Sequence, residues 1–225
     1  ADYYYAKARE NGFTFHSSDV LAFKPNATQR DWIMPSDCGR GADIPYAIDR
    51  KGEGHTTLKD YVKMAIKSLK NPNGFFLMAE GGKIDWACHS NDAASAALEV
   101  LDFDAAVKVA VDFYRKHPDE TTIIVVADHE TGGLSLGLSK TKYKLNPEQL
   151  MNQKISMSEF NGVIEKWRES KPSFEKILSE LNAYFTLGDL DDLTKARIKE
   201  AYDYTFDPKL QDKFPKKFAY GPSEP

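Results

Sequence analysis

Two short stretches of the sequence concentrate carboxylates and imidazoles, the side chains that bind divalent metal ions. The first is Glu80-Gly-Gly-Lys-Ile-Asp85-Trp-Ala-Cys-His89, and the second is Asp128-His129-Glu-Thr-Gly-Gly. Carboxylate oxygen and imidazole nitrogen suit Zn²⁺ at about 2.0–2.2 Å, whereas the additional hard oxygen of Glu80 is better matched to Mg²⁺. The sequence therefore offers five candidate metal ligands: Glu80, Asp85, His89, Asp128 and His129.

The spacing within each stretch fits a shared ion. Asp85 and His89 are four residues apart, so one helical turn would place both on the same face. Asp128 and His129 are adjacent, and both can face one cavity where the chain turns at the end of a strand. Taken alone, an Asp-His pair is more simply a capped loop, and Asp85 with His89 could be a helix-start carboxylate and a solvated imidazole. Two such pairs at neighbouring strand ends favour a metal site.

Two apolar strands are predicted to position these ligands. Residues 75–79 and 121–127 are apolar on both faces, which is typical of buried strands in a parallel sheet. A long helix is predicted between them, capped by Asn91 or Asp92 and running to about Lys116, and the whole forms a right-handed βαβ unit. Because the carboxyl ends of parallel strands share one edge, the ligands should meet there. The helix face predicted to point inward is Ala94, Ala97, Leu98, Leu101, Ala105, Val107, Ala110, Val111 and Tyr114.

The remaining elements follow from periodicity and turn residues. A helix is predicted over 2–10, a strand over 13–16, and an irregular connection over 17–55 with room for one short strand. Another helix begins after Thr57 and ends before Asn71. Residues 140–205 are charged and helical, with apolar stripes around Phe160 and Phe174. These features predict an α/β core over 1–139, a helical insertion over 140–208, and a return segment over 209–225.

Composition excludes several classes of function. The formal charge of −4 and the pI of about 5.8 argue against nucleic acid as the main partner. We find no apolar run long enough to span a bilayer, and the polar, aromatic start of the chain does not resemble a signal peptide.

Cys38 and Cys88 are expected to be free thiols. His16, His55 and His117 are interpreted as structural, and Trp86 fits either the mouth of a site or the core.

The two motifs resemble those of the alkaline phosphatase family. Phe75 to Asp85 with His89 is similar to the segment that binds Mg²⁺ and the first Zn²⁺, and Val125 to Gly133 is similar to the segment that binds the second Zn²⁺. The resemblance implies that Glu80 binds Mg²⁺, Asp85 and His89 one Zn²⁺, and Asp128 and His129 the other. It also implies a mostly parallel central sheet flanked by helices, with a crown-type helical insertion.

The family also implies an activity and a setting. Its members hydrolyse phosphate monoesters through a phosphoserine intermediate, and they are commonly homodimeric and periplasmic or secreted. The chain departs from the family pattern, because it holds no Asp-Ser-Ala or Asp-Ser-Ser nucleophile triplet and no histidine after His129. It therefore contains no catalytic nucleophile, and we interpret it as the carboxy-terminal part of such an enzyme, inactive alone. Two alternatives stay open: a relative resembling phosphoglycerate mutases or sulfatases, and a non-catalytic binding module.

Overall fold

The computed structural model describes residues 2–16, 23–24, 29–35, 43–52, 54–131, 133 and 147–211. The chain divides into two compact units, Ala1–Asn146 and Pro147–Pro225. The predicted boundary between residues 139 and 140 falls outside the described residues, as does most of the predicted return segment. The three-part domain division therefore stays a prediction.

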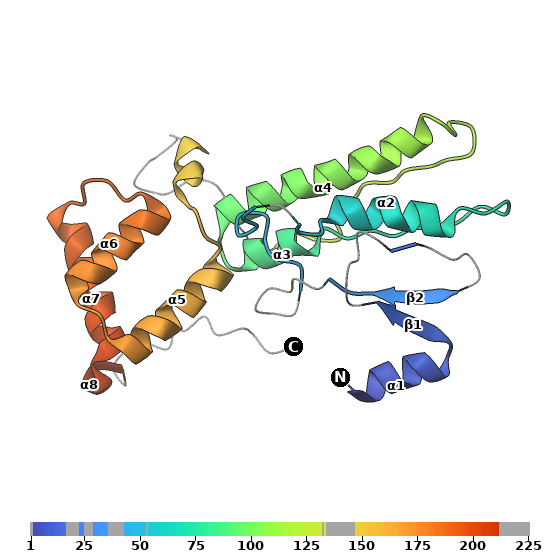
Figure 1. Ribbon diagram of the computed structural model, residues 1–225. Helices are drawn as coiled ribbons and strands as arrows, with labels where there is room; N and C mark the ends of the chain where they lie inside the picture. Colours follow the sequence, from blue (N-terminus) through green and yellow to red (C-terminus); the bar gives the residue numbers. More distant parts are fainter. Residues whose placement is uncertain are drawn as a thin grey trace. The chain divides into compact units, whose positions relative to one another are not determined.

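The first unit opens with a helix and two paired strands (Figure 1). Helix α1 (Asp2–Glu10) leads into β1 (Phe13–His16), which pairs in parallel with β2 (Arg30–Ile33). The ring of Tyr5 packs on Phe15, and Phe15 stacks on Trp32 with ring centroids 5.1 Å apart. The predicted helix and strand are confirmed, and β2 is the short strand for which the irregular connection had room.

Three helices form the rest of this unit and carry the first motif. Helix α2 (Leu58–Leu69) and helix α3 (Gly82–His89) both pack against α4 (Ala93–Tyr114) (Figure 1). Thr57 caps α2 in a capping box with Asp60, and Asp92 caps α4 by accepting from the backbone N–H of Ser95. Side-chain oxygens satisfy amides that the first helical turn leaves without partners, which explains why these local signals located the helices correctly.

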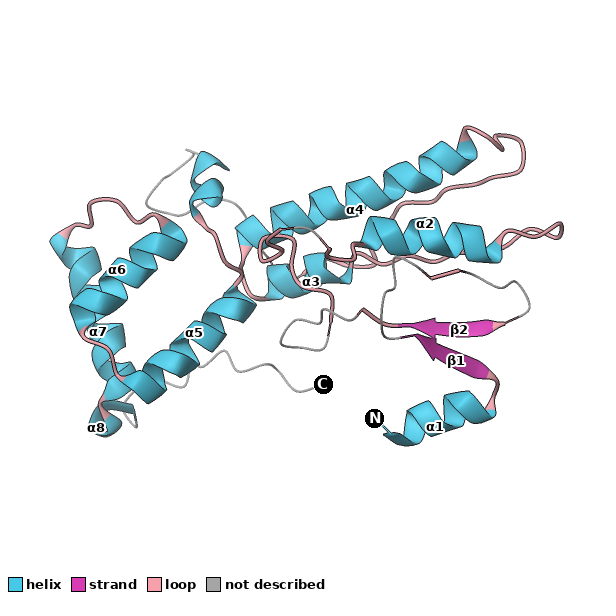
Figure 2. Ribbon diagram, viewed as in Figure 1, coloured by secondary structure: helices cyan, strands magenta, loops and turns pink. Residues whose placement is uncertain are grey.

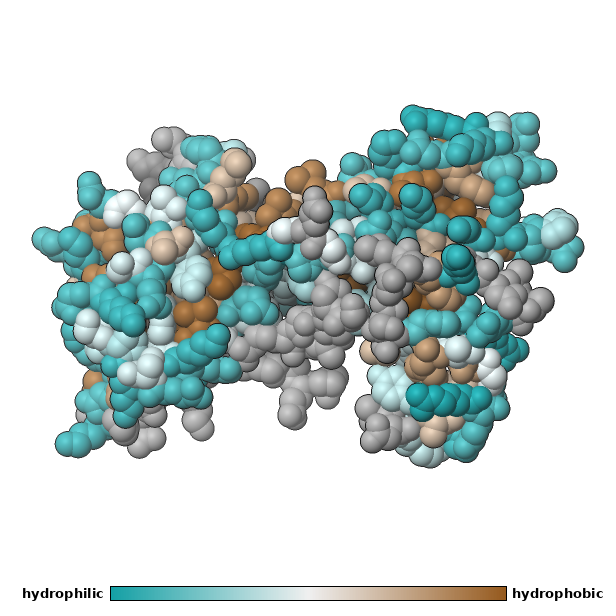
Figure 3. Space-filling view, viewed as in Figure 1, coloured by the Kyte–Doolittle hydropathy of each residue, from teal (hydrophilic) through white to brown (hydrophobic). Residues whose placement is uncertain are grey.

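The face of α4 that is buried differs from the prediction. The buried positions are Ala94, Ser95, Ala96, Glu99 and Ala106, while Leu98, Leu101 and Tyr114 are exposed. Three of the buried residues are alanines, and Ala96 packs with Ala87 of α3, so the buried face does not follow the predicted apolar period. Figure 3 shows apolar side chains along the α4 surface that this packing leaves uncovered.

The prediction of two buried strands flanking α4 is wrong for the described structure. Residues 75–79 and 121–127 run outside regular secondary structure (Figure 2). Phe76, Met78, Ile124 and Val126 each expose more than three quarters of their surface. Residues 75–79 alternate between half-buried and exposed, because α4 covers one side, where Phe75 packs on Phe113. An extended apolar segment forms a buried strand only when neighbouring strands pair with it.

The second unit is helical, as predicted. It comprises the 3₁₀ helix η3 (Pro147–Asn152) and the α-helices α5 (Met157–Ser170), α6 (Phe174–Phe185), α7 (Asp192–Phe206) and α8 (Pro208–Gln211). Its core consists of Phe160, Trp167 and Ile177, which come from the two predicted apolar stripes. Ser156, Ser173 and Asp191 cap α5, α6 and α7.

Helices combined with a parallel sheet place the described structure in the predicted α/β class. Within the residues that the structure describes, no helix has the length and apolar character to cross a membrane.

Candidate metal centre

Glycines at the start of the first motif allow the chain to turn from residues 75–79 into α3. A Cβ atom on Gly81 would lie 3.0 Å from the ring of Phe103, so a side chain there would push the turn away from α4. A Cβ atom on Gly82 would lie 3.2 Å from Glu80 Oε1. The paired glycines therefore let α3 begin immediately after Glu80.

The first predicted ligand pair lies on one face of α3. His89 Nε2 is 3.5 Å from Asp85 Oδ1, and the imidazole is well exposed. Two donors bound to one tetrahedral Zn²⁺ at about 2.0–2.1 Å stand about 3.3 Å apart. The separation of Asp85 and His89 thus fits two neighbouring ligands of one ion.

The second predicted pair has similar geometry. His129 Nε2 lies 3.6 Å from Asp128 Oδ2, and both side chains are exposed. His129 Nδ1 is 2.7 Å from the backbone oxygen of Glu130. Because that oxygen can only accept, Nδ1 carries the proton, and neutral His129 keeps a lone pair on Nε2. Metal-binding histidines characteristically donate their second ring N–H in this way.

Local charge acts on the protonation of His129. The backbone oxygen of Glu130, followed by the carboxylate of Asp128, raises the pKa of His129. The Glu130 side chain also accepts a hydrogen bond from the N–H of Gly133, at 2.8 Å, which closes the turn after the histidine. A cation at this pair would have to displace the proton that the carboxylate favours.

One hydrogen bond joins the two motifs. Thr131 Oγ1 donates to Asp85 Oδ1 at 3.0 Å, across 46 residues of sequence. The motifs therefore meet, although the described residues contain no cluster of three or more His, Cys, Asp or Glu side chains placed to hold one ion. The five predicted ligands all lie in the described part of the chain. Asp85 pairs with His89 and Asp128 with His129, while Glu80 is exposed and belongs to neither pair. Thr131 was not predicted as a site residue from the sequence. The feature that could have indicated it is a hydroxyl two residues after His129.

A polar network holds residues 43–47 against α3 and α4. Glu99 on α4 accepts a hydrogen bond from the backbone N–H of Ala47 at 2.6 Å, and burial raises the pKa of Glu99. Lys83 on α3 forms an ion pair with Asp43, and its ammonium lies 3.9 Å from the ring centroid of Tyr46. Burial, and then the charges of Asp92 and Glu99, raise the pKa of Tyr46 to about 12.

The side chains between the ligands of α3 are also defined. Trp86 is half exposed, so the core position considered for it is excluded, and Lys83 lies 5.0 Å from its ring. Cys88 is a free thiol, as expected, and burial followed by the charge of Asp85 raises its pKa. Cys38 lies outside the described residues.

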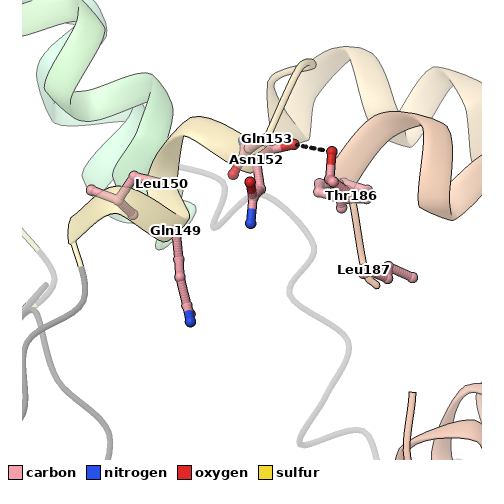
Figure 4. A pocket seen from close by; sticks show the side chains of 7 residues that line it. Gln149, Leu150, Asn152, Gln153, Thr186 and Leu187 are labelled. Carbon is pink, nitrogen blue, oxygen red and sulfur yellow. Dashed lines mark hydrogen bonds between the residues drawn. The ribbon is translucent and has the colours of Figure 1, made fainter. Parts of the chain in front are cut away.

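A separate cavity of about 340 Å³ lies in the helical unit (Figure 4). Its lining residues come from η3, from the end of α6 and from the residues that directly follow these helices: Gln149, Leu150, Asn152, Gln153, Phe185, Thr186 and Leu187. Thr186 Oγ1 donates to the backbone oxygen of Asn152 at 3.5 Å. None of these side chains is ionisable, so they offer no general acid or base.

Comparison with known proteins gives one consistent family. Residues 39–202 match the family model described as alkaline phosphatase. The chain is 41% identical over 121 residues to the repressible alkaline phosphatase of Saccharomyces cerevisiae, and 37% identical over 169 residues to alkaline phosphatase 4 of Bacillus subtilis. These alignments cover 49% and 70% of this chain but 21% and 35% of the relatives. The chain thus matches about a fifth to a third of the relatives' length.

A solved structure supports the fold. The crystal structure of a cold-active alkaline phosphatase from a psychrophilic Shewanella species matches with a TM-score of 0.70 at 22% identity. The match covers 96% of this chain and 51% of that one. At this identity the likeness concerns the fold, and it confirms the predicted α/β arrangement of the family.

Proposed function

The chain belongs to the alkaline phosphatase family, and from that premise we propose that the intact protein hydrolyses phosphate monoesters at a site built on α3 and residues 128–131. The observation that carries this proposal is the pair of Asp–His contacts, at 3.5 and 3.6 Å, in two motifs that Thr131 joins. We propose Asp85 and His89 as ligands of one Zn²⁺, Asp128 and His129 as ligands of a second, and Glu80 as a ligand of Mg²⁺.

The donor chemistry supports this assignment. Imidazole with carboxylate is a zinc donor set, and Glu80, five residues before Asp85, adds a hard oxygen suited to Mg²⁺. Bound cations would neutralise charge on the transferring phosphoryl group and lower the pKa of bound water. The protein's own contribution is to hold the donors in place: α3 fixes the spacing of Asp85 and His89, and the Glu130 oxygen fixes the tautomer of His129.

The chain by itself is proposed to be inactive. It offers two protein ligands to each Zn²⁺, whereas catalytic zinc sites usually have three. It also contains no Asp-Ser-Ala or Asp-Ser-Ser triplet to supply a nucleophile. An assay of this chain with 4-nitrophenyl phosphate, Zn²⁺ and Mg²⁺ should show no turnover above background. Robust metal-dependent turnover would overturn the proposed inactivity.

The activity of the intact protein is tested through the second motif. In the protein encoded by the complete reading frame, His129→Ala should reduce turnover of 4-nitrophenyl phosphate by at least about 100-fold, because it removes one zinc donor. His55→Ala is the control, since His55 contacts the backbone oxygen of Lys51 and lies in neither motif. Equal activities of the two variants would contradict the proposed site.

The substrates, location and assembly of the intact protein are proposals of the same kind. We propose small phosphate monoesters as substrates, a homodimer as the assembly, and the periplasm or the exterior of the cell as the location. Light scattering on the intact protein tests the dimer, and a monomeric mass at micromolar concentration would contradict it. Fractionation of the source cells tests the location, and activity confined to the cytosol would contradict export.

A further inference from the structure

We propose that Thr131 is a positioning residue of the metal centre, which orients the Asp85 carboxylate for Zn²⁺ and ties the second ligand pair to the first. The inference rests on the proposed function, because it assumes that Asp85 binds a metal. Thr131 itself would not touch the ion. It would act through Asp85.

The geometry supports an orienting role. The Thr131 hydroxyl donates to Asp85 Oδ1 at 3.0 Å, and the same oxygen lies 3.5 Å from His89 Nε2. An ionised carboxylate oxygen has two acceptor positions, so the hydroxyl occupies one and leaves the other available. A neutral donor restrains the carboxylate without adding a positive charge that would oppose a cation. The contact therefore restricts the rotation of Asp85 while preserving its negative charge.

The place of Thr131 in the chain gives it a second role. It follows Asp128 and His129 by three and two residues, and it is half-buried where those two are exposed. Its hydrogen bond to Asp85 is the direct side-chain contact between α3 and the second motif among the described hydrogen bonds. Loss of the hydroxyl should therefore loosen the first ligand pair and release the loop that carries the second.

Zinc affinity of this chain is the appropriate readout, because it requires no turnover. Thr131→Val keeps the shape of the side chain but removes the donor, and we expect it to weaken Zn²⁺ binding about 10-fold, within the range typical of groups that support metal ligands. Thr131→Ser restores a hydroxyl and should bind within about twofold of the unaltered chain. Thr122→Val, at an exposed threonine outside both motifs, is the matched control and should leave the affinity unchanged.

Competition with a chromogenic zinc chelator measures these affinities, and circular dichroism confirms that each variant is folded. Weakened binding by the valine variant with recovery by the serine variant supports the inference. Equal binding by the Thr131→Val variant and the unaltered chain overturns it while leaving the metal proposal intact. Absence of zinc binding by the unaltered chain overturns the proposed ligands themselves, so the two failures are distinguishable. Weakening in both the valine and serine variants would assign Thr131 a packing role and also overturn the inference.

Discussion

The helical unit and the site-bearing unit of this chain are stabilised in different ways. In the helical unit, large apolar side chains are buried together: Phe160 packs on Trp167 and Phe185, and Ile177 is almost fully covered. In the site-bearing unit the buried positions are mostly small or polar, while Phe76 and Ile124 are exposed. In the described residues, the helical unit exposes two large apolar side chains, Met151 and Leu193, whereas most of the exposed large apolar side chains belong to the other unit.

This difference bears on how the candidate metal centre is stabilised. Both predicted ligand motifs follow directly after the extended apolar segments, residues 75–79 and 121–127. These segments have few buried contacts, which are the main source of local stability. The candidate ligand pairs are therefore held chiefly by polar contacts and helix geometry: the Thr131 hydrogen bond, the turn closed by Glu130, and the helical turn of α3 from Asp85 to His89.

The largest expected contrast is between two phenylalanines. Phe160→Ala should lower the free energy of unfolding by about 3–5 kcal/mol, because it empties the core of the helical unit. Phe76→Ala should change it by less than about 0.5 kcal/mol, because 87% of that side chain is already exposed. Urea unfolding followed by circular dichroism measures both. Similar losses at the two positions would show that residues 75–79 are covered in solution, and would remove the contrast between the units.

A smaller contrast is expected between two helix caps. Asp92 is buried and accepts from both the N–H and the hydroxyl of Ser95, at 3.1 and 2.8 Å. Asp92→Ala should therefore cost about 2 kcal/mol of unfolding free energy, at the upper end for caps, whereas Ser173→Ala on α6 should cost about 0.5–1 kcal/mol. The same urea experiment compares them. A larger loss at Ser173 would contradict the view that buried polar contacts stabilise the site-bearing unit.

The buried carboxylate of Glu99 should make stability depend on pH. Burial raises its folded-state pKa above the unfolded value, so the folded protein binds the proton more tightly. The tighter proton binding contributes to the free energy of unfolding. That contribution is fully present below the pKa of Glu99 in the unfolded chain, and it is lost as pH rises through the pKa in the folded protein. The stability of the unaltered chain relative to Glu99→Gln should therefore fall as pH increases from about 4. Unfolding curves across this range test the sign, and a relative stability that rises with pH would contradict it.

The smallest expected effect is on the exposed His129. The charge of Asp128 is the second cause of its raised pKa, so Asp128→Asn should lower that pKa. The shift should be partial, because the Glu130 backbone oxygen remains as the larger cause. Titration of the imidazole by NMR measures it, with Asp104→Asn on α4 as the control. An unchanged pKa in Asp128→Asn would mean that the carboxylate and the imidazole are apart in solution.

The sequence predicted the helices well because their signals are local. The box of Thr57 with Asp60 and the cap at Ser156 stand beside the helices they start, and the stripe containing Phe160 and Trp167 lies within one helix. Strands depend on partners elsewhere in the chain. Residues 75–79 and 121–127 have the composition of buried strands, but composition does not supply neighbours, and the prediction of their burial was wrong.

The candidate site shows the same limit. Five candidate ligands could be proposed from motif and spacing, and the structure places four of them in two close pairs. Thr131 could not be proposed, because its contact with Asp85 spans 46 residues and follows no period. The prediction of the inward face of α4 was wrong for a related reason. The buried face includes small residues such as Ala96, which packs with Ala87 of α3, and hydrophobic periodicity does not show which residues a distant segment will cover.

The central claim is that α3 and residues 128–131 of this chain bind divalent cations. Diffraction data from crystals of the chain grown with Zn²⁺, collected on both sides of the zinc absorption edge, test it most directly. We predict anomalous peaks about 2.0–2.2 Å from donors of Asp85 and His89 and of Asp128 and His129. Peaks confined to other side chains, with both pairs empty at saturating Zn²⁺, would contradict it.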